Sequence, residues 1–170
     1  MKYAKVNGKD YVMEDMRKLV TIEKNNAFMK APTESWYVAA HLNRESDRIG
    51  LQYHLLIMSA EGMPSVVSLN INLVNEAKKL CKSLELAFPL DALQISTDRF
   101  FVEGPDFQFS GDADFVRCAY HGADCQIELD CKTTRPVLKY LGEGFGDFLG
   151  AEQYGYSFPA MDARGQIVMD

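Results

Sequence analysis

The stretch ADCQIELDC, residues 123–131, alternates apolar and polar side chains without a break. The apolar phase holds Cys125, Ile127, Leu129 and Cys131, and the polar phase holds Asp124, Gln126, Glu128 and Asp130. Successive side chains of a β-strand point to opposite faces, so this period of two predicts a strand that is buried on one face only. We expect the apolar set to face the core and the polar set to face water, because a one-residue slip would bury every polar side chain.

The same period of two recurs along the chain, in SVVSLNINLV (65–74) and in PDFQFSGD (105–112). Turn signals separate the runs, namely NRESD, AEGMP, VEGPD, SGDAD, YHGAD and GEGFG. Short strands with a turn at every eight to twelve residues or so are typical of antiparallel barrels and sandwiches. The sequence therefore predicts an all-β fold of about eight to ten strands with little helix.

Two segments carry a weak helical signal, DMRKLVTIEKNNAFM (15–29) and VNEAKKLCKSLE (74–85). In the second, Leu80 and Leu84 are four residues apart, which fits one face of a helix. Both segments are equally readable as strand or loop. No internal repeat or linker interrupts the chain, so we expect a single β domain over residues 1–170, with residues 1–30 either part of it or an N-terminal extension.

The composition excludes several classes of function. The chain has 170 residues, of which 47% are hydrophobic and 25% charged, which is a globular composition. A formal net charge of −6 disfavours nucleic acid and anionic membranes as partners. No run is apolar enough for a signal peptide or for membrane insertion, so we expect a cytoplasmic protein whose four cysteines are free thiols.

No motif predicts a metal or a cofactor. The chain has no C-x-x-C pair, and its three histidines, His41, His54 and His121, lack the spacing of a zinc helix. The glycines of YLGEGFGD (140–147) follow G-x-G-x-G rather than a dinucleotide-binding pattern, and no helix pattern comes after them. We read that stretch as a connection between strands.

The most informative stretch for function is ESWYVAAHLNRESDRIGLQYHLLIM, residues 34–58, which reads as a hairpin around NRESD. Its second strand carries Gln52 and His54 on a face that is otherwise apolar. Buried amide and imidazole groups need hydrogen-bond partners, which a ligand cavity supplies. The alternative is a sheet face that is half exposed to water or covered by another segment.

This stretch resembles the E-W-W-Y and G-x-Q signature of the lipocalin-like carotenoid hydratase superfamily. VRCAYHGADCQIELDCKTTRPVLKYLGEGFG (116–146) and EQYGYSFPAMDARGQI (152–167) are similar to later motifs of the same family, in the same order. Ser35 and Gly155 depart from the family pattern, which has aromatic residues at those positions. Members of the family are generally longer, with two barrels, and include hydratases and cyclases.

The resemblance implies a lipocalin-like antiparallel β-barrel with an apolar ligand cavity. The candidate ligand-binding residues are Trp36, Gln52 and Tyr156, which match the motifs of the family, together with His54 and Tyr154. In the picture that follows from it, Trp36 and Tyr156 line one cavity with Gln52. Because a lone barrel exposes surface that the two-barrel relatives bury, we also expect a homodimer or pairing with a second barrel.

Three functions compete at this point. The first is binding of a small, largely apolar molecule of terpenoid or polyketide type. The second is a hydratase or cyclase that protonates a polyene, for which Glu34 and Glu152 are the candidate general acids. The third is an interaction module that buries a face of the barrel against a partner chain.

Overall fold

The computed structural model describes residues 2–6, 9–14, 33–44, 47–59, 62–97, 99–112, 114–135, 137–139, 145–148 and 151–169. The chain divides into two units, one of residues 32–93 and the other of residues 1–31 together with 94–170. Every strand pair in the described residues is antiparallel. The predicted all-β antiparallel class is therefore confirmed.

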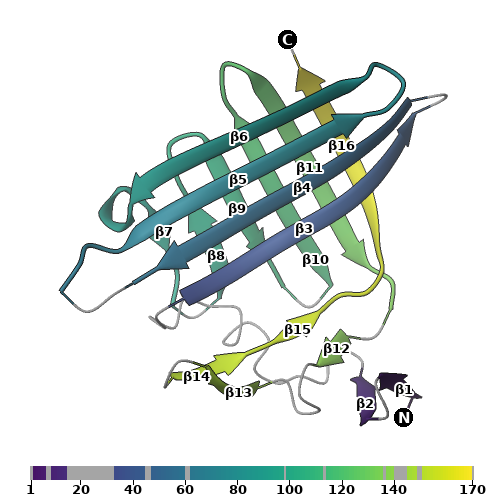
Figure 1. The fold of residues 1–170 in the computed structure, drawn as a ribbon, viewed down its shortest axis with the longest axis vertical. Helices are drawn as coiled ribbons and strands as arrows, with labels where there is room; N and C mark the ends of the chain where they lie inside the picture. The colour runs from purple at the N-terminus through teal and green to yellow at the C-terminus, as the bar shows by residue number, and fades with distance from the viewer. Residues whose placement is uncertain are drawn as a thin grey trace. The chain divides into compact units, whose positions relative to one another are not determined.

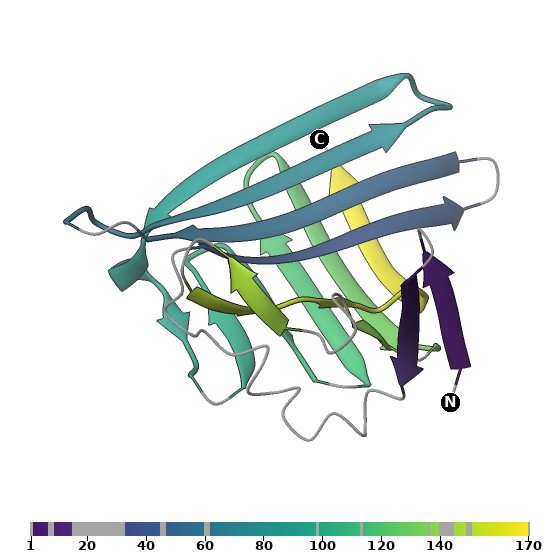
Figure 2. The same ribbon diagram turned by 60° about the horizontal axis from the view of Figure 1, so that its bottom comes forward.

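The unit of residues 32–93 holds a four-stranded meander in the order β3-β4-β5-β6 (Figure 1). Its strands are β3 (Thr33–Arg44), β4 (Asp47–Met58), β5 (Val66–Asn75) and β6 (Leu80–Pro89), and the 3-10 helix η2 (Leu90–Ala92) follows them. Figure 2 shows these four strands side by side along their length. Neighbours in the chain are neighbours in the sheet, as short hairpin connections require.

The other unit contains a six-stranded sheet in the order β16-β11-β10-β9-β8-β7. Its strands are β7 (Gln94–Ile95), β8 (Phe100–Glu103), β9 (Phe107–Gly111), β10 (Phe115–His121), β11 (Cys125–Thr133) and β16 (Met161–Met169). The same unit has a four-stranded sheet of β1 (Lys2–Val6), β2 (Lys9–Glu14), β12 (Val137–Lys139) and β15 (Tyr156–Ser157), and a hairpin of β13 (Phe145–Phe148) and β14 (Ala151–Tyr154).

Strand β11 confirms the alternation of residues 123–131. Cys125, Ile127, Leu129 and Cys131 are at most 3% exposed, and the four polar residues that alternate with them are exposed. The same pattern holds in β5, where Val67, Leu69, Ile71 and Leu73 are buried. Burying each such side chain contributes about 1.5–3 kcal/mol, so the period of two is what places the core.

The turn after β9 forms where SGDAD predicts it, whereas the turn between β5 and β6, at residues 76–79, was not among the predicted turns. Side chains close both turns. After β9, the Asp112 carboxylate accepts hydrogen bonds from the backbone N–H groups of Asp114 (2.8 Å) and Phe115 (2.9 Å). Between β5 and β6, the side-chain oxygen of Asn75 accepts from the Lys78 N–H (3.0 Å), and Lys79 adopts a positive φ of 50°. Asp and Asn are favoured in turns for this reason, since their side chains replace a missing backbone partner.

The finer predictions about the fold are not confirmed by the structure. The strands of the described residues form open sheets with no closed barrel among them, so the lipocalin-like barrel is not confirmed. The strand count of about ten was too low, because the described residues form sixteen strands, of which several are short. The helical alternative for residues 74–85 is wrong, because this segment forms the end of β5, a turn and the start of β6. The segment 15–29 lies outside the described residues.

Candidate functional site

The register of the β3–β4 hairpin decides which predicted site residues share a face. Glu34 pairs with Ile57 and Trp36 with Leu55. Among the residues that alternate with these, Tyr37 pairs with His54 and Ala39 pairs with Gln52. Residues directly opposite one another in an antiparallel pair lie on the same side of the sheet. Trp36 and Gln52 are therefore on opposite faces of the β3–β6 sheet.

This register corrects one prediction. Trp36 and Gln52 were expected to line the same cavity, but a single sheet separates the two side chains. The error has a simple cause, because a shift of one residue in the pairing reverses the face of a whole strand. The pairing of Arg44 with Asp47 leaves a two-residue connection. The sequence marks NRESD as a turn but does not say how many of its residues are left unpaired, so it does not fix these faces.

One side of the sheet, here called the apolar face, is built from alternate residues of the four strands. Its central rows are Glu34, Ile57, Val67 and Phe88, then Trp36, Leu55, Leu69 and Leu86, then Val38, Tyr53, Ile71 and Leu84. The members from β4 and β5 are fully buried, whereas those from the edge strands β3 and β6 are half-buried apart from Val38. Glu34 and Trp36 thus combine a carboxylate and an indole at the partly accessible edge of a hydrophobic surface.

The other side, here called the polar face, carries uncharged hydrogen-bonding side chains across all four strands. Asn72 donates from its amide to Gln52 Oε1 (3.2 Å), and the Ser83 hydroxyl donates to Asn72 Oδ1 (2.7 Å). A row away, the Asn70 amide donates to Ser68 Oγ (3.0 Å). Gln52 is exposed. The glutamine is thus held in a cross-strand ladder on the outside of the sheet.

His54 belongs to the same polar face. Its Nε2 lies 2.8 Å from Ser35 Oγ, and its ring meets that of Tyr37 edge to face at 6.2 Å between centroids. Burial lowers the pKa of His54 below its ordinary value, since the charged form loses water contacts. A neutral imidazole hydrogen-bonded to a serine hydroxyl resembles a Ser–His catalytic dyad. The Ser35–His54 pair rests on this single solvent-exposed contact, which does not by itself meet the geometric test for a nucleophile.

The remaining predicted residues belong to the other unit. Glu152 and Tyr154 lie in β14, where Tyr154 pairs with Phe145, and Tyr156 lies in β15 opposite Lys139. Their backbones are described, but their side chains lie outside the description. The proposed role of Glu152 as an acid, and those of the two tyrosines in ligand binding, stay predictions.

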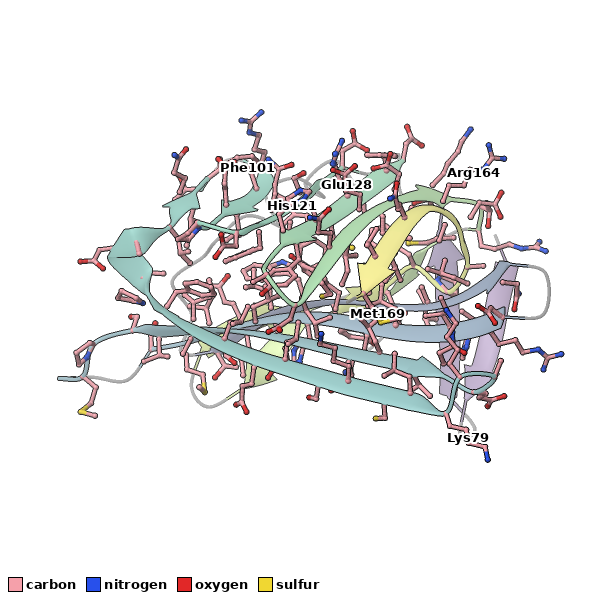
Figure 3. The ribbon with its side chains drawn as sticks, turned by 90° about the horizontal axis from the view of Figure 1, so that it is seen from above. Lys79, Phe101, His121, Glu128, Arg164 and Met169 are labelled. Carbon is pink, nitrogen blue, oxygen red and sulfur yellow. The ribbon has the colours of Figure 1, made fainter. Side chains whose placement is uncertain are left out.

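Sequence reasoning missed a charged ladder on the six-stranded sheet. Arg117 on β10 lies 3.6 Å from Glu128 and 4.0 Å from Asp130, both on β11. His121 lies 3.5 Å from Glu128, and Figure 3 shows these two side chains next to one another. Pairs of this kind, exposed to solvent, contribute about 0–1 kcal/mol each, so they support the register of the sheet rather than form a site.

The opposite side of this sheet buries three of the four cysteines, Cys118, Cys125 and Cys131, and all four cysteines are free thiols as predicted. Burial raises the pKa of Cys131 to about 11 and also raises that of Cys118, because a thiolate is poorly solvated there. These thiols therefore behave as small hydrophobic side chains rather than nucleophiles.

Within the described part of the chain, no group of three or more His, Cys, Asp or Glu side chains could hold a metal ion. Among these residues there is also no helix of the length and apolarity needed to span a membrane. Comparison with known protein families, with curated proteins and with solved structures found no match to this chain. The resemblance to the carotenoid hydratase superfamily therefore rests on the sequence motifs alone.

Proposed function

We propose that this protein binds a small, largely apolar molecule, of terpenoid or polyketide type, on the apolar face of the β3–β6 sheet. The observation that carries the proposal is the position of Glu34 and Trp36 on the edge strand β3. Both are half-buried and share a face with the fully buried Leu55 and Ile57. Ligand sites are commonly apolar surfaces with aromatic side chains and a few polar groups that fix the orientation of the ligand.

The chemistry of this edge defines the kind of ligand. Trp36 offers a flat ring with a single N–H donor. Glu34, two residues earlier on β3, offers a carboxylate acceptor. An elongated hydrocarbon with a polar end would lie along the half-buried edge residues Trp36, Ala40 and Leu42, with its polar end at Glu34. The tyrosine of this face, Tyr53, is fully buried and lies in the neighbouring row, opposite Val38.

The test uses Trp36, which is the only tryptophan of the chain. A polyene such as retinol is titrated into the full-length protein while tryptophan emission is recorded, and saturable quenching is expected. Glu34→Gln, on the same face, is expected to weaken binding of a polyene alcohol several-fold. Gln52→Ala, on the polar face, is the matched control and is expected to leave binding unchanged. Emission that stays constant up to saturating polyene would refute the proposal.

A second candidate, a hydratase or cyclase, is favoured by one observation. Glu34 is a carboxyl group on a predominantly apolar face, and such an environment suits a general acid. In this version the Glu34 carboxyl would transfer its proton to a polyene double bond, which leaves a carbocation and a carboxylate. Capture of the cation by water, or by another double bond in a cyclisation, is then followed by loss of a proton back to the Glu34 carboxylate. The wild-type protein would then convert a polyene to product, and Glu34→Gln would bind the polyene without converting it. This result would favour the enzyme over the binding function.

A further inference from the structure

The polar face of the β3–β6 sheet carries few charges for a surface exposed to water. Its residues are Thr33, Ser35, Tyr37, Ala39, His41 and Asn43 on β3, Arg48, Gly50, Gln52, His54, Leu56 and Met58 on β4, Val66, Ser68, Asn70, Asn72 and Val74 on β5, and Cys81, Ser83, Glu85, Ala87 and Pro89 on β6. Arg48 and Glu85 are the only Asp, Glu, Lys or Arg side chains among these described residues.

The exposed side of the six-stranded sheet has the opposite character. It carries charges of both signs on neighbouring strands: Arg117 on β10, Glu128, Asp130 and Lys132 on β11, and Asp162 and Arg164 on β16. Figure 3 shows Glu128 and Arg164 pointing away from the ribbon. The same chain therefore builds one sheet surface with interspersed charges, as expected for contact with water, and another almost without them.

The polar face also exposes large apolar side chains. Tyr37 is 58% exposed, Met58 46%, Val66 41% and Val74 44%. Depletion of charged residues distinguishes the centre of protein interfaces from the rest of a protein surface, and Tyr and Met are two residue types that such centres favour. The amide and hydroxyl groups between these side chains already have partners within the face, such as Asn72 with Gln52, so covering them would leave few hydrogen bonds unmade.

We propose that this polar face is an association surface for a second copy of the same chain, with the two-fold axis parallel to the strands. Such an axis places β3 of one copy opposite β6 of the other, and β4 opposite β5. Each cross-strand row of residues therefore faces the same row of the second copy, in reverse order. Met58 then faces Val66 of the second copy, and Gly50 faces Val74. These exposed apolar side chains of one copy therefore face uncharged positions of the other.

The polar rows are self-complementary under the same operation. Tyr37, at one end of a row, faces Glu85, at the other end, in the second copy, and the phenol can donate to the carboxylate. Gln52 faces Asn72, and each amide offers both a donor and an acceptor. The charged residue of β6 therefore meets a hydrogen-bond donor instead of a like charge.

The size of the face is adequate for a stable dimer. With about 4.8 Å between strands and about 3.3 Å per residue, four strands of about ten residues cover roughly 600 Å² in projection. A standard interface buries about 800 Å² of accessible surface on each partner. Protruding side chains raise accessible area above projected area, so the polar face comes close to this size.

The first test is the mass of the full-length protein by light scattering at micromolar concentration. One chain has a mass of 19.2 kDa, and a particle of twice that mass is expected. Val74→Lys places a charge opposite Gly50 of the second copy and is expected to halve the mass. Val168→Lys is the matched control, since Val168 is a 39% exposed valine on β16, and it is expected to leave the dimer intact.

The second test fixes the geometry and does not depend on a destabilising variant. The axis brings His41 of one copy over Cys81 of the other, about 10 Å away if the two faces pack like stacked sheets. Within one chain these residues are three strand spacings apart, about 14 Å. A bis-maleimide chosen to span the distance between stacked sheets, about 10 Å, is therefore expected to cross-link His41→Cys into a covalent dimer, and the same variant with Cys81→Ser is not.

The outcomes decide between the alternatives. A wild-type particle with the mass of one chain would overturn the proposal. So would a Val74→Lys variant that keeps both the wild-type circular dichroism spectrum and the dimer mass. If that variant does not fold, the cross-linking result decides, and a failure of His41→Cys to cross-link refutes this arrangement of the two copies.

Discussion

Gly165 on β16 is the position where the structure makes the sharpest demand on residue type. It pairs with Leu129 on β11, and a Cβ atom placed on it would overlap the backbone carbonyl oxygen of Glu128. The Glu128 carbonyl carbon and the Leu129 Cα would each be 2.9 Å from that Cβ. Since all three atoms are backbone, no side-chain rotation can relieve the overlap. In Gly165→Ala, strands β11 and β16 must separate locally.

The magnitude follows from what this separation disrupts. About two ladder hydrogen bonds next to the site would be lost or lengthened, at about 1 kcal/mol each. The strain of an extra methyl group in a close-packed site adds about 1–3 kcal/mol. We therefore expect Gly165→Ala to lower the free energy of unfolding by about 3–5 kcal/mol, a large part of the roughly 5–15 kcal/mol that holds a typical domain.

The assay is urea denaturation followed by far-UV circular dichroism, with Gly50→Ala as the matched control. Gly50 also lies inside a strand, but the nearest atom to its added Cβ is Val74 Cβ at 4.0 Å, an ordinary contact. Replacing a strand glycine by alanine without a clash stabilises by about 0.5–1 kcal/mol. If Gly165→Ala unfolds within about 0.5 kcal/mol of the wild type, the close approach of the two strands is not what selects glycine here.

Three further results are expected. Lys79→Gly should be neutral or stabilise by up to about 1 kcal/mol in thermal unfolding, because glycine tolerates the positive φ at this turn; a clear destabilisation, with Lys79→Ala unchanged, would contradict this reading. Because burial lowers the pKa of His54 in the folded state, its contribution to stability is complete above the unfolded value of 6.5 and is lost as the pH falls below it; His54→Gln should flatten this part of the stability–pH profile, and an unchanged slope would count against it. In thiol labelling of the native protein, Cys81 should react quickly and Cys131, buried with its pKa raised to about 11, only at the rate of unfolding; fast labelling in a Cys81→Ser variant would show that the core strand is accessible.

The positions of the strands and the face that each buries were largely readable from the sequence. In β11 and β5 the alternation of apolar and polar residues is strict, and a period of two fixes the buried side without reference to any other strand. The turn after β9 was equally local, because Asp112 closes it through its own side chain. Leu80 and Leu84 show the limit of such reasoning, since a spacing of four places two residues on one face of a helix and also on one face of a strand.

The relation between strands was decided by the tertiary structure. Whether Gln52 lines a cavity with Trp36 or a polar ladder with Asn72 depends on which residues stand opposite each other in the hairpin. A sequence pattern gives the two faces of a strand but does not say which face of its neighbour each one joins. Pairing between strands fixes that choice, and it turned a predicted pocket residue into part of an exposed surface. Gly165 illustrates the same point, because the atom that forbids a side chain there belongs to Glu128, far away in the chain.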